Sequence, residues 1–194
     1  RGMGHLFRAV NLAGALAHCE RRFVILVNNH AASIDILHRH GLPHRVVDLD
    51  DHMSGWEKRV VDELGINLWI NDRLDTDVVH AHRVKASGIP LVTFDDRGSG
   101  AELADLHIAA LAFDNAEVLS GRRVLRSVEY LILSPEIERY RRVRTELGSI
   151  VVNLGGSDTY GVTVRVVKAL AKHGRAATVV VGPSFEHHEE LQQA

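Results

Sequence analysis

The sequence is poor in several features that define whole classes of protein. Its 194 residues include one cysteine, Cys19, so no disulfide can form within the chain and a disulfide scaffold is excluded. No apolar run approaches the ~18 residues of a membrane-spanning helix, and no signal peptide is recognisable. These absences favour the cytoplasm, where thiols stay reduced. Because Cys19 follows an apolar helical stretch, we expect it to be a small, at least partly buried hydrophobic residue.

An excess of charge of one sign is also missing. Lys and Arg together number 23 and Asp and Glu 25, which gives a formal net charge of −2. Without surplus cations to displace counterions from a phosphate backbone, the chain is not a dedicated nucleic-acid binder. The arginines at 139, 141, 142 and 144 have acidic neighbours at Glu136, Glu138 and Glu146 and are typical of a solvated helix face. A hydrophobic content of 45% and a charged content of 25% fit an ordinary globular protein instead.

Short apolar runs alternate along the chain with helix-like stretches. The runs predict buried β-strands at 23–27, 45–47, 68–70, 90–94, 130–133, 150–152 and 177–181. Helices are expected at 6–17, from Ser54 onward, at 78–86 and at 162–171, with Ser54 and Glu57 forming a capping box and with Gly88, Gly148 and Gly174 as helix stops. This alternation predicts an α/β fold with a doubly wound, Rossmann-like parallel sheet. Functional residues are then expected just after the strands.

The two ends of the sequence look cut. The chain opens on a glycine turn with no strand before it, although such a turn normally follows one, so we expect a missing first strand. Residues 1–148 then form a nearly complete first lobe, 149–194 open a second lobe, and the charged stretch 136–147 connects the two.

The glycine turn at residues 2–8 is the first candidate site. Gly4 lets the backbone approach a ligand, and the helix that follows offers free N–H groups to an anion. His5 lies at the start of this helix, where the positive end of the dipole favours a neutral imidazole that can accept a proton from water. The alternative is a histidine that only caps the helix. Arg8 lies one turn later on the same face, where it contacts either an anion or an acidic neighbour.

A nicotinamide dinucleotide is not expected at this turn. The dinucleotide fingerprint needs a third glycine, where this chain has Phe7. It also needs an acid about 20 residues on, and that place holds Asn28 and Asn29. No cofactor is predicted.

Polar residues follow two of the predicted strands. Asp72 comes after the third strand and is a candidate substrate-binding residue, whereas Asp75 or Thr76 is expected to cap the next helix. Asp95 and Asp96 follow the fourth strand. Because adjacent side chains on an extended chain point to opposite faces, we expect one of them, assigned as Asp96, to face the site and the other to be structural.

The stretch 152–159 is the last candidate. A strand, the turn of Gly155, Gly156 and Ser157, and a helix rich in Val and Ala suit a phosphate cradle made of backbone N–H groups. The turn lacks the lysine of a P-loop, and Asp158 is expected to cap the helix. The alternative is a tight turn with a cap and no ligand.

Two other kinds of site find no support. The sequence contains 13 histidines, but the close pairs do not have the helical i, i+4 spacing with an intervening glutamate. We therefore predict no metal and place most histidines at the surface. No G-x-S-x-G elbow is present either, so a serine hydrolase is not indicated.

The G-x-G-H-x-x-R pattern of residues 2–8 and the L-G-G-S-D pattern of 154–158 resemble nucleotide-sugar enzymes of the GT-B type. The likeness is strongest to the group of the pseudaminic-acid pathway UDP-sugar hydrolase and the spore-coat polysaccharide protein SpsG, with MurG-type glycosyltransferases as more distant relatives. Residues 71–76 and 95–101 resemble a subgroup that is often joined to, or found beside, sialic-acid-type cytidylyltransferases.

The resemblance implies two Rossmann-like lobes, the second incomplete here, with a nucleotide-sugar such as a UDP-sugar between them. By position, His5 would activate a water that attacks the anomeric carbon, and Gly155, Gly156 and Ser157 would line the nucleotide side. Leu74 departs from the hydrolase pattern, which has a tyrosine at that place. Hydrolysis and glycosyl transfer in surface-polysaccharide or nonulosonic-acid synthesis therefore both stay open, as does a non-catalytic sugar-nucleotide-binding scaffold that acts with a cytidylyltransferase.

Overall fold

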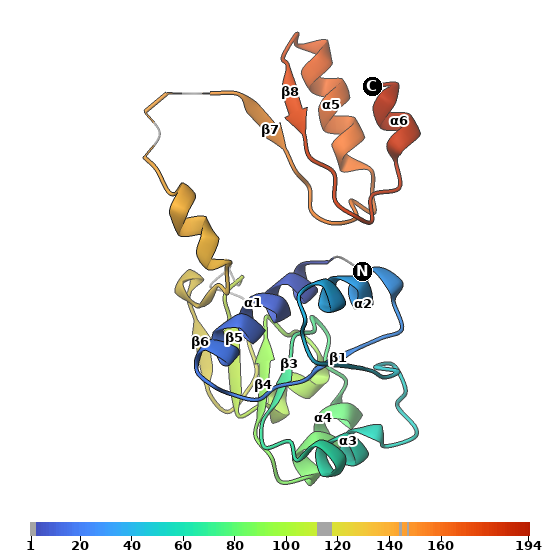
Figure 1. The fold of residues 1–194 in the computed structure, drawn as a ribbon, viewed down its shortest axis with the longest axis vertical. Coiled ribbons are helices and arrows are strands. Elements are labelled where there is room, and N and C mark those ends of the chain that lie inside the picture. The colour runs from blue at the N-terminus through green and yellow to red at the C-terminus, as the bar shows by residue number, and fades with distance from the viewer. Residues whose placement is uncertain (1–2, 112–117, 144, 147) are drawn as a thin grey trace. The chain divides into compact units, whose positions relative to one another are not determined.

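The computed structural model describes residues 3–111, 118–143, 145–146 and 148–194 (Figure 1). The chain divides into two compact units. One consists of Val47–Ile132, and the other combines Arg1–Val46 with Leu133–Ala194. The division into lobes at residue 148 stays a prediction.

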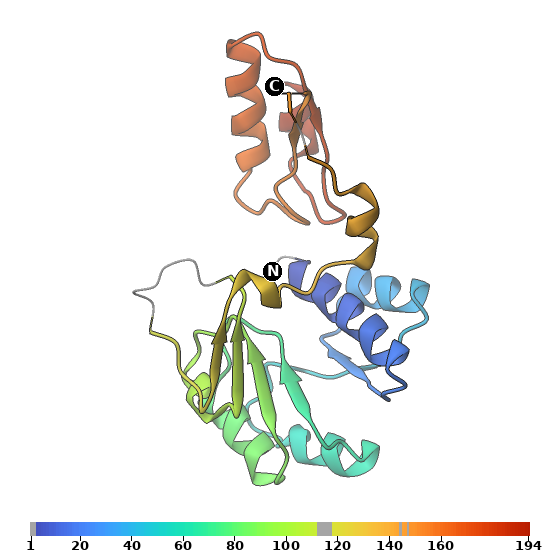
Figure 2. The same ribbon diagram turned by 90° about the vertical axis from the view of Figure 1, so that its left-hand side faces the viewer.

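The unit Val47–Ile132 is built on a four-stranded sheet (Figure 2). Its strands are β3 (Trp69–Asn71), β4 (Leu91–Phe94), β5 (Leu106–Ala109) and β6 (Val124–Arg126). They lie side by side in chain order, and each pair of neighbours is parallel. The carboxyl ends of β3 and β4 therefore meet at one edge of the sheet, as the sequence predicts for functional residues.

Two α-helices pack beside this sheet and against each other. They are α3 (Trp56–Leu64) and α4 (Val78–Ala86), and short 3₁₀ turns follow at η1 (Ser99–Leu103) and η2 (Val128–Tyr130). Val84 and Leu91 are fully buried and form part of the core between α4 and β4. The strand expected at 130–133 is wrong, because that segment begins at the end of η2 and continues without regular structure.

The other unit contains two parallel strand pairs. The first pair, β1 (Ile25–Val27) and β2 (His44–Val46), accompanies α1 (Gly4–His18) and α2 (Ala31–Arg39). The second pair, β7 (Ile150–Val152) and β8 (Ala177–Val179), accompanies α5 (Val162–Lys172) and α6 (His188–Gln192), after the 3₁₀ segment η3 (Pro135–Tyr140). The prediction of an α/β fold with parallel sheets is confirmed.

Some local predictions fail for identifiable reasons. The N-cap of α3 is Gly55 with φ 62°, not Ser54, because the backbone N–H of Ser54 donates to the carboxylate of Asp51. Glu57 is then buried instead of completing a capping box. Cys19 is exposed at the C-cap of α1, not partly buried.

The glycine stops are correct in two places and wrong in one. Gly88 and Gly174 have φ of 74° and 61° and follow α4 and α5. No described helix ends at Gly148, since the preceding 3₁₀ segment η3 closes at Tyr140.

Candidate functional site

Helix α1 begins at Gly4, and Gly2 of the predicted glycine turn lies outside the described residues. Met3 is the N-cap of this 15-residue helix and makes no side-chain capping hydrogen bond, and the first turn carries no acidic residue. A Cβ added at Gly4 would meet no atom within 4 Å, so the backbone is open there. The helix thus presents amide N–H groups and the positive end of its dipole beside open space.

His5 and Arg8 both lie in the first two turns of α1 and are half-buried. They are three residues apart, which places them on the same side of the helix. The imidazole therefore stands beside the helix N-terminus with a guanidinium one turn behind it. This arrangement suits an anion near the helix start and a base above it.

The glycine turn after β7 divides its residues between two environments. Gly155 is exposed with φ 87°, and its N–H donates to the Asn153 side chain at 3.0 Å. Gly156 is packed closely, because a Cβ at this position would lie 2.8 Å from the Cβ of Met3. Within this unit the two glycine-rich turns therefore touch, through Met3 and Gly156.

A third segment closes on the same turn. The N–H of Ser184 donates to the carbonyl of Gly156 at 2.9 Å, and a Cβ added at Gly182 would lie 2.4 Å from the Cα of Gly156. Ser157 is half-buried, with its hydroxyl 3.2 Å from that of Thr159. The turn is thus held by the loop after β8, and Gly155 is its exposed part.

Asp158 satisfies the start of α5 as expected, although the N-cap residue itself is Gly161. Its two carboxylate oxygens accept hydrogen bonds from the N–H groups of Val162 and Thr163, at 2.9 and 2.7 Å. Desolvation is the largest single influence and raises the pKa of Asp158, but the hydrogen bonds from Thr163 and Val162 together outweigh it and hold the pKa below its usual range. Its charge is directed at the helix start.

At the carboxyl end of β3, Asp72 is half-buried and follows the buried Asn71. The helix cap here is Asp77, not Asp75 or Thr76. The carboxylate of Asp77 accepts from the N–H groups of Val79 and His80, at 2.7 and 3.3 Å. The hydrogen bond from Val79 contributes most to lowering the pKa of Asp77.

At the carboxyl end of β4, Asp95 and Asp96 are both buried, at 4% and 1% exposure, whereas the sequence predicts that one of them faces the site. Asp95 has φ 48° and accepts a hydrogen bond from the N–H of Leu111. Asp96 Oδ1 accepts from the N–H groups of Thr76 and Gly98, each at 2.9 Å. Asp96 Oδ2 is buried and has no hydrogen-bond partner in the described part of the chain.

His107 on β5 contacts the loop after β4, which carries Asp96. Its Nδ1 lies 2.7 Å from the carbonyl of Ser120, which can only accept, so the ring carries its hydrogen there. Its Nε2 then accepts from the N–H of Asp96 at 3.1 Å. His107 is fully buried and is an exception to the prediction that most histidines lie at the surface.

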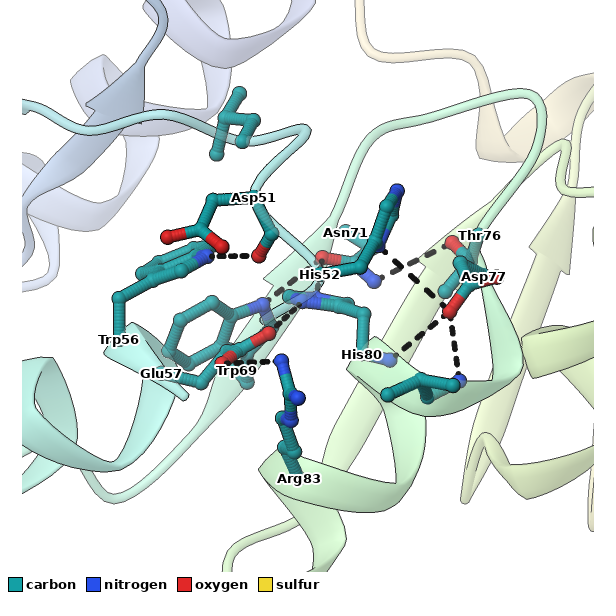
Figure 3. Close-up of polar contacts among 12 residues, drawn as sticks. Asp51, His52, Trp56, Glu57, Trp69, Asn71, Thr76, Asp77, His80 and Arg83 are labelled. Carbon is teal, nitrogen blue, oxygen red and sulfur yellow. Dashed lines mark hydrogen bonds and ion pairs between the residues drawn. The ribbon is translucent and has the colours of Figure 1, made fainter. Parts of the chain in front are cut away.

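A second buried histidine, His80, forms a cluster that the sequence does not predict (Figure 3). His80 Nδ1 lies 2.9 Å from Glu57 Oε1, and His80 Nε2 lies 3.3 Å from Asn71 Oδ1. The rings of Trp56 and Trp69 pack on the imidazole, with centroids 5.8 and 5.5 Å away. Burial is the main cause that lowers the pKa of His80, and the hydrogen bond to Glu57 opposes it.

Of the residues in the His80 cluster, only Glu57 carries a signal in the sequence. Its position is that of a capping glutamate, and this local pattern gives no indication of its partner, which lies 23 residues away.

Among the described residues, no three His, Cys, Asp or Glu side chains come together as a metal-binding group. In the same part of the chain, no helix is long and apolar enough to cross a membrane.

No protein-family model and no curated protein sequence matches the chain. A similar solved structure is the crystal structure of Acinetobacter baumannii MurG, with a TM-score of 0.60 and 15% sequence identity. The match covers 98% of this chain and 60% of MurG, so the chain spans less than two thirds of that protein's length. At this identity the likeness establishes a MurG-like fold.

Proposed function

We propose that the protein acts on a nucleotide-sugar by inverting displacement at the anomeric carbon, in the synthesis of a surface polysaccharide or a nonulosonic acid. The observation that carries this proposal is the MurG-like fold over 98% of the chain, together with a histidine at the uncapped start of α1. The GT-B resemblance of residues 2–8 and 154–158 points the same way. Hydrolysis of a UDP-sugar and transfer of its sugar to an acceptor are the two forms of the reaction.

His5 is the proposed general base. Its imidazole takes a proton from the attacking water or acceptor hydroxyl, whose oxygen forms a bond to the anomeric carbon from the side opposite the diphosphate. The bond between that carbon and the diphosphate oxygen breaks, and the electron pair leaves with the nucleoside diphosphate. The sugar is released, or transferred, with inverted configuration.

The diphosphate needs donors that are in place before the reaction begins. The exposed turn of Gly155, with Gly156 and Ser157 behind it, is the proposed nucleotide side. Met3 packs on Gly156, which brings the open start of α1 at Gly4 next to this turn. Arg8 supplies a cation on the same helix. Asp72, which is half-buried, is the proposed sugar-binding residue of the other unit, whereas Asp96 is 1% exposed and is not a direct sugar contact.

The test offers UDP-sugars to the full-length protein, with and without acceptor, and measures release of nucleoside diphosphate. His5→Ala is expected to lower the rate by roughly 10²–10⁴-fold, the range for loss of a general base. His18→Ala is the matched control, because His18 is an exposed histidine at the other end of α1. A rate unchanged by His5→Ala would remove His5 as the base.

A second candidate is a non-catalytic sugar-nucleotide-binding protein that serves a cytidylyltransferase. The observation in its favour is Leu74, which is 49% exposed at the place of the hydrolase tyrosine. Binding of UDP without turnover in any acceptor mixture would support this candidate over the enzyme.

A further inference from the structure

The polar side chains of the His80 cluster continue, bond by bond, to the end of β4. Glu57 of α3 contacts His80 of α4, and His80 contacts Asn71 at the carboxyl end of β3 (Figure 3). Asn71 Nδ2 donates to Thr76 Oγ1 at 3.3 Å, and the N–H of Thr76 donates to Asp96 Oδ1. All five residues are at most 5% exposed. The chain of contacts thus joins the helix layer to the sheet edge where Asp72 and Asp96 lie.

The orientation of the Asn71 amide in this chain is determined by Trp69. Its Nε1–H can only donate, and it lies 2.8 Å from Asn71 Oδ1, so the amide oxygen of Asn71 faces Trp69 and His80. The amide nitrogen must then face Thr76. His80 contacts Asn71 through Nε2 and Glu57 through Nδ1.

Close backbone contacts restrict the loop that carries Asp96. A Cβ added at Gly98 would lie 2.2 Å from the backbone nitrogen of Thr76, and one at Gly100 would lie 2.6 Å from the carbonyl oxygen of Asp77. The loop after β4 is therefore pressed against the loop after β3. A shift of Thr76 must move the carboxylate of Asp96, because Thr76 and Gly98 are the two N–H groups that hold its Oδ1.

We propose that Glu57, His80, Asn71 and Thr76 are positioning residues that, through Asp96, fix the loops after β3 and β4 at the carboxyl ends of the strands for binding of the substrate. Asp96 is 1% exposed and holds both loops through its Oδ1, so the substrate meets the loops and not the carboxylate of Asp96. The substrate part of this inference rests on the proposed function, whereas the positioning of Asp96 does not.

The charges around the pair are consistent with a positioning role. Arg83 of α4 lies 3.9 Å from Glu57 Oε2, and the charge of Arg73, from the loop after β3, disfavours the protonated ring of His80. Asp77 favours the protonated ring, and His52, from the loop before α3, is 3.8 Å from Asp77. Two cations therefore lie near the buried pair, and the pair itself does not reach solvent.

The test removes the side-chain hydrogen bond that joins Asn71 to Thr76. Thr76→Val removes the hydroxyl that Asn71 contacts and keeps the backbone N–H that donates to Asp96, while Thr76→Ser retains the hydroxyl. Amide hydrogen exchange is followed at residues 76 and 98. We expect Thr76→Val to lower protection at both amides by roughly tenfold, and Thr76→Ser to restore it. His80→Gln is expected to act in the same direction.

Asp105→Asn is the matched control for general loss of stability. Asp105 accepts from Lys85 and from the N–H of Leu91, at the amino end of β4, away from Asp96. This variant is expected to weaken the same sheet and to leave exchange at residues 76 and 98 unchanged relative to global unfolding. Equal effects of Asp105→Asn and Thr76→Val at these two amides would overturn the positioning role.

Steady-state kinetics separate this inference from the proposed function. With a UDP-sugar as substrate, Thr76→Val is expected to raise KM roughly tenfold with kcat within about twofold, the pattern of lost binding. A wild-type protein that neither binds nor turns over UDP-sugars would contradict the proposed function, and the exchange measurement would still decide whether the network holds Asp96. A change confined to kcat would contradict substrate binding by the loops that Asp96 holds.

Discussion

At the scale of single residues, close backbone approaches decide which substitutions the protein tolerates. Gly98→Ala is expected to destabilise the protein by about 2 kcal/mol or more, because the new Cβ would be forced against the backbone nitrogen and oxygen of Thr76. Gly14→Ala is the control. Gly14 lies inside α1 with nothing within 4 Å of an added Cβ, so alanine there should stabilise by about 0.5–1 kcal/mol.

Urea denaturation of the two glycine variants measures both effects. A Gly98→Ala protein as stable as the wild type would mean that the loops after β3 and β4 do not press together. The proposed positioning of Asp96 would then lose its support at this point.

The residue scale also shows a titration that controls stability. Burial holds the folded pKa of His80 below 6.5, the ordinary value of a histidine, so the unfolded chain binds the proton more tightly than the folded one. The contribution is complete above pH 6.5 and is lost as the pH falls from 6.5 toward the folded pKa. The free energy of unfolding is therefore expected to fall over this window, and less steeply in His80→Gln.

Chemical denaturation between pH 8 and pH 5 checks this expectation. His173→Gln serves as the control, because His173 is an exposed histidine at the C-cap of α5. Parallel stability curves for the wild type and His80→Gln would show that His80 does not titrate differently in the two states.

At the scale of elements, the position of a helix cap is open to direct measurement. Asp77→Ala is expected to cost about 1 kcal/mol, the usual effect of losing an N-cap carboxylate, because Asp77 satisfies two N–H groups at the start of α4. Asp75→Ala should change stability by no more than about 0.5 kcal/mol, as is usual for an exposed residue. Thermal or urea denaturation distinguishes the two, and a larger effect at Asp75 would contradict the observed cap.

The elements show how far the sequence predicts the structure. Strands β4 and β7 were predictable because β-branched and apolar residues dominate their sequences, although β4 is largely buried and β7 has two of its three residues exposed. Strand β5 was not, since it carries His107, a polar side chain that is buried because the carbonyl of Ser120 and the N–H of Asp96 satisfy its ring. A contact between distant segments, and not local composition, makes that residue suitable for a strand.

The candidate site divides in the same way. The turns around His5 and Gly155 were predictable because glycine at a strand or helix end has a local meaning. The burial of Asp96 and the pairing of Glu57 with His80 depend on long-range contacts, across 20 and 23 residues respectively. No local pattern carries that information.

At the scale of the whole molecule, the MurG-like fold and the parallel sheets limit the possible functions without selecting one. A fold alone does not determine the reaction. The stereochemistry at the anomeric carbon is therefore the property that tests the proposed reaction. In the proposed reaction, His5 at the start of α1 takes the proton of a water or acceptor that attacks from the face opposite the leaving diphosphate. Inversion is the outcome that this proposal predicts.

The most direct test is proton NMR of the sugar product while the full-length protein turns over an α-linked UDP-sugar, such as UDP-N-acetylglucosamine, with water or an added acceptor. The account predicts that the β-anomer forms first, together with UDP, before any free sugar mutarotates. First appearance of the α-anomer would contradict inverting displacement, and the absence of UDP release across a panel of UDP-sugars and acceptors would contradict the proposed enzyme itself.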